Sequence, residues 1–181
     1  PDEAEVSYRK AIELKPDYAV AHYNLGNILK GLDRPDEAEV SYRKAIELKP
    51  DYALAHNNLG NILKGLGRYE EAEASYKRAI TLKPNMDFLL GSWMHTKMHL
   101  CMWGDLSSNL DKLIKRVNNK NKVITPFPLL SLSDEPSIHR KAAEISSKNM
   151  FPKLDIFPKI SLYHNHKKIR IGYFSPDFKN H

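Results

Sequence analysis

The segment PDYAVAHYNLGNILKGLDRPDEAEVSYRKAIELK, residues 16–49, is followed directly by PDYALAHNNLGNILKGLGRYEEAEASYKRAITLK, residues 50–83. The two segments carry the same residue at 25 of 34 positions, and residues 1–15 repeat residues 35–49 without a change. A period of this length with apolar side chains at helical spacing indicates stacked pairs of helices. We therefore expect a mainly α fold that begins as an α-solenoid over residues 1–84, with a half repeat at 1–15 and full repeats at 16–49 and 50–83.

Two glycines stand at matching places in each full repeat. Gly26 and Gly60 have no side chain, so we expect the second helix of each repeat to approach the first closely at these points. Gly31 and Gly65 are expected to end the first helix in the left-handed conformation, which glycine adopts without strain. Each helix pair still leaves an apolar face open, so neighbouring repeats must stack on one another.

Two asparagines also recur with the period of the repeat, Asn24 with Asn58 and Asn27 with Asn61. A carboxamide donates and accepts hydrogen bonds at once, which suits the backbone of an extended peptide. These four residues are therefore the candidate peptide-binding residues. The alternative is that one of the pairs is only solvated or caps a neighbouring turn. One period after Asn58 the residue is Ser92, so the row of asparagines is expected to stop there.

The composition bears on several classes of protein. No apolar run in the sequence approaches the roughly 18 residues that a membrane-spanning helix needs, so we expect no membrane partner. Cys101 is the only cysteine. A single cysteine excludes an intrachain disulfide framework and favours a reducing, cytoplasmic location. We expect Cys101 to be a small core residue. Residues 1–84 hold 13 Lys and Arg against 14 Asp and Glu, and the remainder holds 15 against 8. The excess of basic residues is scattered and no nucleic-acid motif accompanies it, so no nucleic-acid partner is expected.

Residues 85–118 keep helical periodicity but lose the repeat consensus. We expect them to form a degenerate repeat of capping helices on the end of the solenoid, the second of which Asp105 or Ser107 would cap. His95 and His99 lie four residues apart, a spacing that can place two imidazoles on one metal ion. No third ligand stands nearby in the sequence, so no metal is expected.

The chain changes character after residue 118. Prolines and asparagines break regular structure over residues 119–137, and residues 119–167 are expected to form an interdomain linker with one helix, at 137–149. Residues 168–181 contain a short apolar run, 169–175, that ends in a polar loop. This pattern predicts the first strand of an α/β domain that is truncated at the end of the chain.

These parts resemble known families. The repeats match the tetratricopeptide pattern residue by residue, including Leu-Gly in the first helix and Tyr and Ala in the second. Three later segments resemble the O-linked N-acetylglucosamine transferase family, including its bacterial and SPINDLY-like members. These segments are CMWGD at 101–105, TPFPLLSLSDEP at 125–136 and IRIGYFSPDFKNH at 169–181.

The resemblance implies a two-lobed, Rossmann-like glycosyltransferase that moves a sugar, commonly N-acetylglucosamine from UDP-GlcNAc, to Ser or Thr without a metal. Asn24 and Asn58 match the positions at which the family grips the acceptor backbone, and His181 matches a catalytic-site histidine. The donor pocket of the family lies mostly in its second lobe. The 181 residues are therefore expected to be an N-terminal part of such an enzyme, to hold no cofactor and to be inactive alone.

Two alternatives stay open at this point. A tetratricopeptide scaffold for protein–protein interaction, without any enzymatic domain, would carry the same repeats. A relative that uses another donor, such as GDP-fucose, would carry the same motifs. In each case the expected partner is a protein or peptide in the concave groove of the solenoid, and the open repeat edges can also pair with a second copy of the chain.

Overall fold

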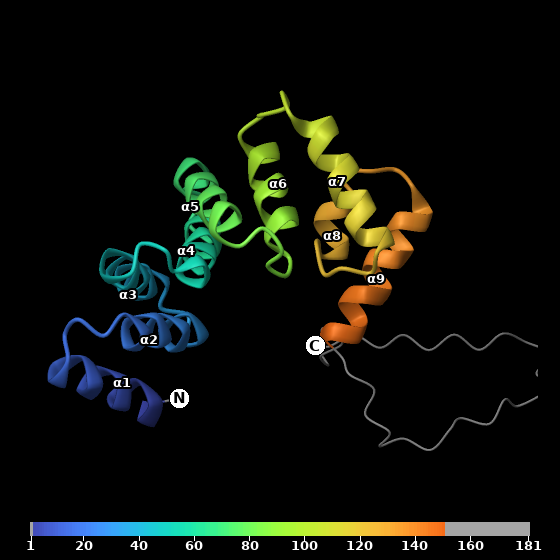
Figure 1. Cartoon of the computed structure of the whole chain (residues 1–181). Helices are drawn as coiled ribbons and strands as arrows, with labels where there is room; N and C mark the ends of the chain where they lie inside the picture. The colour runs from blue at the N-terminus through green and yellow to red at the C-terminus, as the bar shows by residue number, and fades with distance from the viewer. Residues whose placement is uncertain (1, 151–181) are drawn as a thin grey trace, which may run out of the picture.

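The computed structural model describes residues 2–150, and every regular element in this range is an α-helix (Figure 1). The helices are α1 (Asp2–Leu14), α2 (Ala19–Gly31), α3 (Pro35–Leu48), α4 (Ala53–Gly65), α5 (Tyr69–Leu82), α6 (Leu89–His99), α7 (Leu106–Asn118), α8 (Pro126–Leu129) and α9 (Pro136–Met150). The expected mainly α fold is confirmed for these residues, whereas the expected strand at 169–175 and His181 lie outside them. No helix in this part of the chain is long and apolar enough to cross a membrane.

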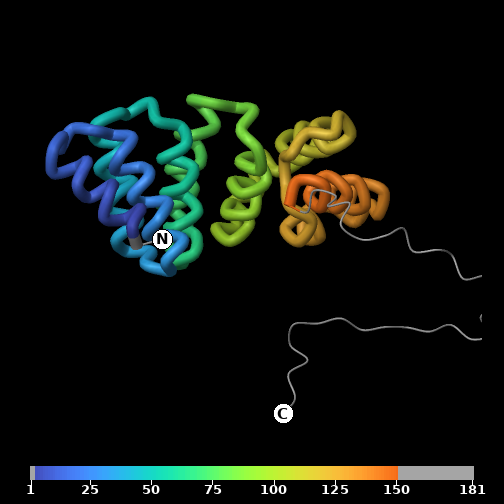
Figure 2. Tube along the Cα trace, turned by 90° about the horizontal axis from the view of Figure 1, so that it is seen from below, coloured from blue at the N-terminus to red at the C-terminus, as the bar shows by residue number. Residues whose placement is uncertain are grey.

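The first six helices follow an arc, with α2, α4 and α6 along its inner side and α3 and α5 along its outer side (Figure 1). Helix α2 packs on α3, and α4 packs on α5, to make two helical hairpins. Contacts of α3 with α4 and of α5 with α6 join one hairpin to the next. Helices α7, α8 and α9 form a second group beyond α6 (Figure 2). Neighbours in sequence are therefore neighbours in space, as in a solenoid.

One hydrophobic core runs through the repeats, and its largest fully buried members alternate between the two kinds of helix: Leu29, Tyr42, Leu63, Tyr76 and Leu89. The two tyrosine rings lie directly against the glycines of the preceding helix. A Cβ atom added to Gly26 would stand 2.6 Å from Cε1 of Tyr42, and one added to Gly60 would stand 2.8 Å from Cδ1 of Tyr76. The predicted close approach at both glycines is confirmed.

The prediction that Gly31 and Gly65 adopt the left-handed conformation is wrong. Both residues end their helices, but the positive φ angles belong to Asp33 (φ 57°) and Gly67 (φ 75°), two residues further on. In each repeat the next backbone N–H donates to a carbonyl five residues back, at 3.0 Å in the first repeat and 2.9 Å in the second. This bond closes a helix around a left-handed residue. The helical turn thus continues past the glycine before the chain reverses.

Arginines tie each repeat to the one before it. Arg34, just before α3, contacts Glu5 of α1 with an Nη1–Oε2 distance of 2.8 Å, and it also pairs with a glutamate of α3. One period later Arg68 makes the same two kinds of contact, reaching Glu39 of α3 at 2.7 Å. The side chains of Glu5 and Glu39 are only 14% and 12% exposed. These ion pairs therefore lie in the interface between successive repeats.

Trp93 of α6 joins the repeats to the second group of helices. Its ring packs against the core of the repeats and against a second core made by α6 to α9. Its Nε1–H donates to a carboxylate oxygen of Glu73 on α5 at 2.9 Å. The segment after α7 also reaches α6, where the N–H of Gly91 donates to the Val123 carbonyl at 3.0 Å. The capping helices are thus fastened to the solenoid through α6.

Three local predictions differ from the structure. The expected loop at 119–137 contains α8, because the fixed φ of Pro126 suits the first position of a helix. Asp105 precedes α7 as expected, but its carboxylate pairs with Lys97 and makes no capping bond. Cys101 is exposed, with a φ of 54°, so the prediction that it is a core residue is wrong. It lies in the turn between α6 and α7, where few side chains cover it.

Candidate peptide-binding surface

The four asparagines singled out by the repeat period all lie on inner-side helices. Asn24 and Asn27 belong to α2, and Asn58 and Asn61 belong to α4. Residues three apart on a helix share a face. All four side chains are half-buried. The structure therefore brings the four carboxamides to the same side of two adjacent helices.

Asn27 and Asn58 bond to each other across the boundary between repeats. Nδ2 of Asn58 donates to Oδ1 of Asn27 at 2.9 Å and to the hydroxyl of Tyr23 at 3.3 Å. The same Oδ1 accepts a hydrogen bond from the hydroxyl of Tyr42 at 2.9 Å. These bonds satisfy polar groups at the interface and fix α2 on α4. This pair therefore supports the stacking of the repeats.

Asn61 repeats the role of Asn27 one period later. Its Oδ1 accepts a hydrogen bond from the hydroxyl of Tyr76 at 2.8 Å. Burial raises the pKa of Tyr42 and Tyr76 far above the ordinary value, so both hydroxyls remain protonated donors. Within residues 2–150, the Oδ1 atoms of Asn27 and Asn61 accept these hydrogen bonds, whereas their Nδ2 groups donate none. Both amino groups can therefore donate to an added acceptor, such as a peptide carbonyl.

Asn24 differs from the other three residues. Its carboxamide takes part in no hydrogen bond within the described part of the chain, although Asn58, one period later, reaches back to Asn27. Within residues 2–150, neither the donor nor the acceptor of Asn24 has a hydrogen-bond partner. On α6 the equivalent residue is Ser92, and the row of carboxamides ends on α4.

His95 on α6 occupies the place of Asn27 and Asn61, one period further along the chain. The sequence indicated His95 only as a candidate metal ligand, although it stands 34 residues after Asn61, which is the signal for this match. Nδ1 of His95 is buried and has no hydrogen-bond partner within residues 2–150. The tyrosine that bonds Asn61 has no counterpart one period later, where the residue is Leu110.

Basic and aromatic side chains surround His95. The rings of His95 and His99 meet edge to face with centroids 4.7 Å apart, and His99 stacks on Tyr69 at 4.4 Å. Burial, followed by the charges of His99 and Lys64, lowers the pKa of His95. No group of three His, Cys, Asp or Glu side chains among residues 2–150 is placed to hold a metal ion. His95 and His99 therefore belong to a packed joint between α5 and α6.

Known proteins similar to this chain share its repeats. Residues 19–52 and 53–86 each match the family model described as tetratricopeptide repeat, and residues 2–33 match a model described as TPR repeat. No curated protein matches the chain.

Two solved structures illustrate the likeness. The first TPR of Spaghetti (RPAP3), bound to the HSP90 peptide SRMEEVD, is 26% identical with a TM-score of 0.54, over 55% of this chain and 79% of that one. The MamA protein is 21% identical with a TM-score of 0.55, over 87% of this chain and 70% of that one. The second likeness extends beyond the repeats and concerns the fold alone.

Proposed function

Because residues 2–86 are tetratricopeptide repeats, we propose that their inner side binds an extended segment of another polypeptide. The observation that carries this proposal is the row of carboxamides on α2 and α4, which keeps hydrogen-bonding groups that the fold does not use. These groups are the whole carboxamide of Asn24 and the amino groups of Asn27 and Asn61. The similar repeats of RPAP3 hold a peptide, which supports a peptide as the class of ligand.

The chemistry of the row favours recognition of a peptide main chain. Neutral carboxamides match the carbonyl and N–H groups that recur along every extended peptide. The inner side also carries Lys30 and Lys64, each three residues after an asparagine of the row and hence on a similar face. Burial lowers the pKa of Lys64, so a bound carboxylate would also stabilise its charged form.

Replacing Asn24 by Ala tests the proposal most directly, because this side chain makes no internal hydrogen bond in the described chain. We expect a loss of peptide affinity of about 3- to 10-fold, the usual worth of one neutral hydrogen bond. The probe is SRMEEVD together with peptides selected on the chain from a displayed random library, each titrated by fluorescence anisotropy. Circular dichroism and the urea midpoint should not change.

The matched control is Asn85→Ala, which removes the same group from an exposed loop between α5 and α6. Asn58→Ala should lower both affinity and the urea midpoint, because it also breaks the bond to Asn27. Equal affinity in the wild type, Asn24→Ala and Asn58→Ala would remove the proposal.

We also propose that the bound polypeptide is an acceptor for sugar transfer. This finer proposal is supported by the sequence resemblance of 101–105, 125–136 and 169–181 to the O-linked N-acetylglucosamine transferase family. In that reading UDP-GlcNAc is the donor, His181 belongs to the catalytic site, and residues 1–181 alone are inactive. The alternative is a tetratricopeptide scaffold that recruits partners and has no catalytic domain.

The test of the finer proposal is expression of the complete reading frame that contains these residues. Incubation with UDP-GlcNAc and a Ser/Thr-containing peptide that binds the repeats should add the mass of one N-acetylglucosamine. His181→Ala should abolish the transfer while Asn24→Ala raises the KM for the peptide. An open reading frame without a nucleotide-sugar domain would favour the scaffold.

A further inference from the structure

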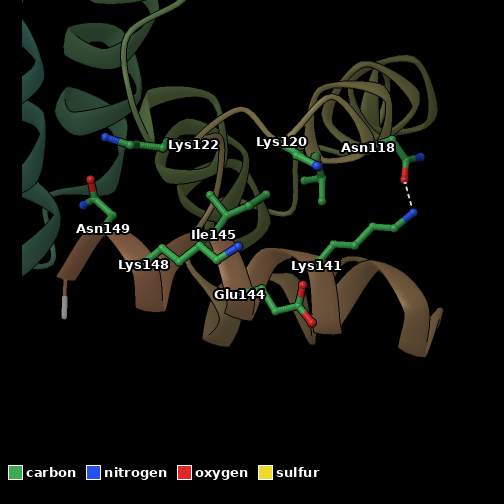
Figure 3. A pocket seen from close by; sticks show the side chains of 9 residues that line it. Asn118, Lys120, Lys122, Lys141, Glu144, Ile145, Lys148 and Asn149 are labelled. Atoms are coloured by element: carbon green, nitrogen blue, oxygen red, sulfur yellow. Dashed lines mark hydrogen bonds between the residues drawn. The ribbon is translucent and has the colours of Figure 1, made fainter. Parts of the chain in front are cut away.

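Four lysines surround a cleft between the end of α7 and α9 (Figure 3). The cleft has a volume of about 520 Å³. Lys120 and Lys122 belong to the segment that follows α7, and Lys141 and Lys148 belong to α9. A cavity of this size can enclose several side chains of a peptide. The repeats lie on the other side of α6, so this cleft is separate from the row of carboxamides (Figure 2).

Little negative charge balances these lysines. Lys122 lies 3.3 Å from a carboxylate oxygen of Asp87. Lys141 donates to the neutral Oδ1 of Asn118 at 2.6 Å, and Lys120 and Lys148 have no acidic partner within residues 2–150. Within residues 2–150, three of the four lysines therefore face the cleft without an acidic partner.

Glu144 is the one acidic side chain that residues 2–150 contribute to the lining, and it does not alter this balance. Glu144 pairs with Arg140 on the same helix at 3.0 Å. Its charge is therefore already offset by a neighbour outside the cleft. An anionic ligand would be attracted to the uncompensated lysines, since like charges grouped around a concave surface reinforce each other's field.

The apolar part of the cleft restricts the class of anion. The aliphatic side chains of Val117 and Ile145 contribute to its lining, from α7 and α9 respectively. Among residues 2–150, no aromatic ring lines the cleft. Single-stranded nucleic acids are held largely by stacking on aromatic rings, so this surface is poorly suited to them. An aliphatic side chain between carboxylates fits the same surface well.

We propose that this cleft binds an acidic peptide segment of a partner protein, in which carboxylates flank an aliphatic residue. Charge complementarity selects this occupant. The remaining part of the chain, residues 151–181, carries 6 Lys and Arg against 2 Asp and Glu, so its own charge opposes occupation of the cleft. The chain would thus have two peptide-binding surfaces, a neutral one on the repeats and a basic one beyond α6.

The test uses the 181-residue chain and a fluorescein-labelled probe of sequence EELEE, titrated by fluorescence anisotropy. The cleft variant is Lys120→Glu with Lys148→Glu, both of which alter exposed side chains. We expect it to weaken binding about tenfold or more, because each reversed charge repels the probe. A probe of sequence EESEE should also bind more weakly to the wild type, since it lacks the aliphatic side chain.

The matched control is Lys112→Glu with Lys115→Glu, on exposed positions of α7 that do not line the cleft. It changes the net charge equally and should retain the affinity of the wild type. The cleft variant is also made in an Asn24→Ala background, where it should weaken EELEE binding by the same factor as in the wild type, which separates the cleft from peptide binding by the repeats. Equal loss of affinity in the cleft variant and the lysine control would overturn the proposal.

Two further results would assign the cleft to another occupant and overturn the proposal. The first is a single-stranded oligonucleotide that binds more tightly than EELEE and loses its affinity in the cleft variant. The second is a dimer in analytical ultracentrifugation that disappears in the cleft variant, which would indicate a second copy of the chain.

Discussion

Gly60→Ala is expected to destabilise the repeats, although alanine favours a helix more than glycine does. The added Cβ would stand 2.8 Å from Cδ1 and Cε1 of Tyr76, and 3.0 Å from Cζ. The ring has no exposed surface, and its hydroxyl is held by Oδ1 of Asn61, so it cannot swing away. Overpacking of this kind costs about 1–3 kcal/mol, and we expect a value near the upper end. The helix-propensity gain of about 1 kcal/mol offsets part of it, which leaves a net loss of about 2 kcal/mol.

Gly65→Ala is the matched control for this change. Gly65 ends the same helix, and an added Cβ would meet no atom within 4 Å. We expect it to leave the free energy of unfolding unchanged or to raise it by up to about 1 kcal/mol. Urea denaturation followed by circular dichroism measures both variants. If Gly60→Ala were as stable as Gly65→Ala, the packing argument for the glycine would be refuted.

Three further variants test other parts of the structure by urea denaturation. Arg68→Ala should lower the midpoint more than Arg140→Ala, because Arg68 bonds a mostly buried carboxylate of the preceding repeat whereas the Arg140 pair is exposed; equal effects would contradict this. The pKa of His95 is lowered by folding, so its contribution to stability is complete above about pH 6.5 and declines as the pH falls toward the folded pKa. His95→Asn should make stability less sensitive to pH in that range, and an unchanged profile would contradict this. Tyr76→Phe should cost about 1 kcal/mol, because Asn61 loses its hydrogen-bond donor; a neutral effect would show that the bond contributes nothing.

The repeats were predictable because their period is long, regular and almost free of substitutions. The period located the helix pairs, the close contacts at Gly26 and Gly60, and the end of the solenoid core. The later helix predicted at 137–149 is also present, as α9, one residue longer at each end. The helical turn α8 was missed because its prolines suggested a break, although Pro126 stands where a helix tolerates proline best.

The contacts between repeats were harder to predict than the repeats themselves. The sequence suggested that residues one full period apart, such as Asn24 and Asn58, lie in register. In the structure the carboxamide of Asn58 meets that of Asn27, 31 residues away, and Arg68 meets Glu39, 29 residues away. The inner helices of successive repeats, α2 and α4, are displaced by about one turn relative to each other, and a period alone does not reveal that displacement.

The basic cleft could not be predicted from the sequence because its lysines are scattered over residues 120–148. Only the packing of α9 beside the end of α7 gathers them around one cavity. The sequence shows an excess of basic residues in this half of the chain, but it carries no information about which of them share a surface.

The exact repetition of residues 1–15 at 35–49 has a consequence for how such a molecule can change in length. Two successive units each supply a glutamate to the arginine of the next unit, as Glu5 receives Arg34 and Glu39 receives Arg68, whereas Glu73 in the third unit accepts from Trp93. A duplicated copy of residues 16–49 would therefore contain both an arginine for the glutamate of the preceding unit and a glutamate for the arginine of the following unit. Whole units can be added or lost by gene duplication or deletion, and each step would move the capping helices by one fixed increment relative to α1. The distance between α1 and the capping helices is therefore set by the number of repeats.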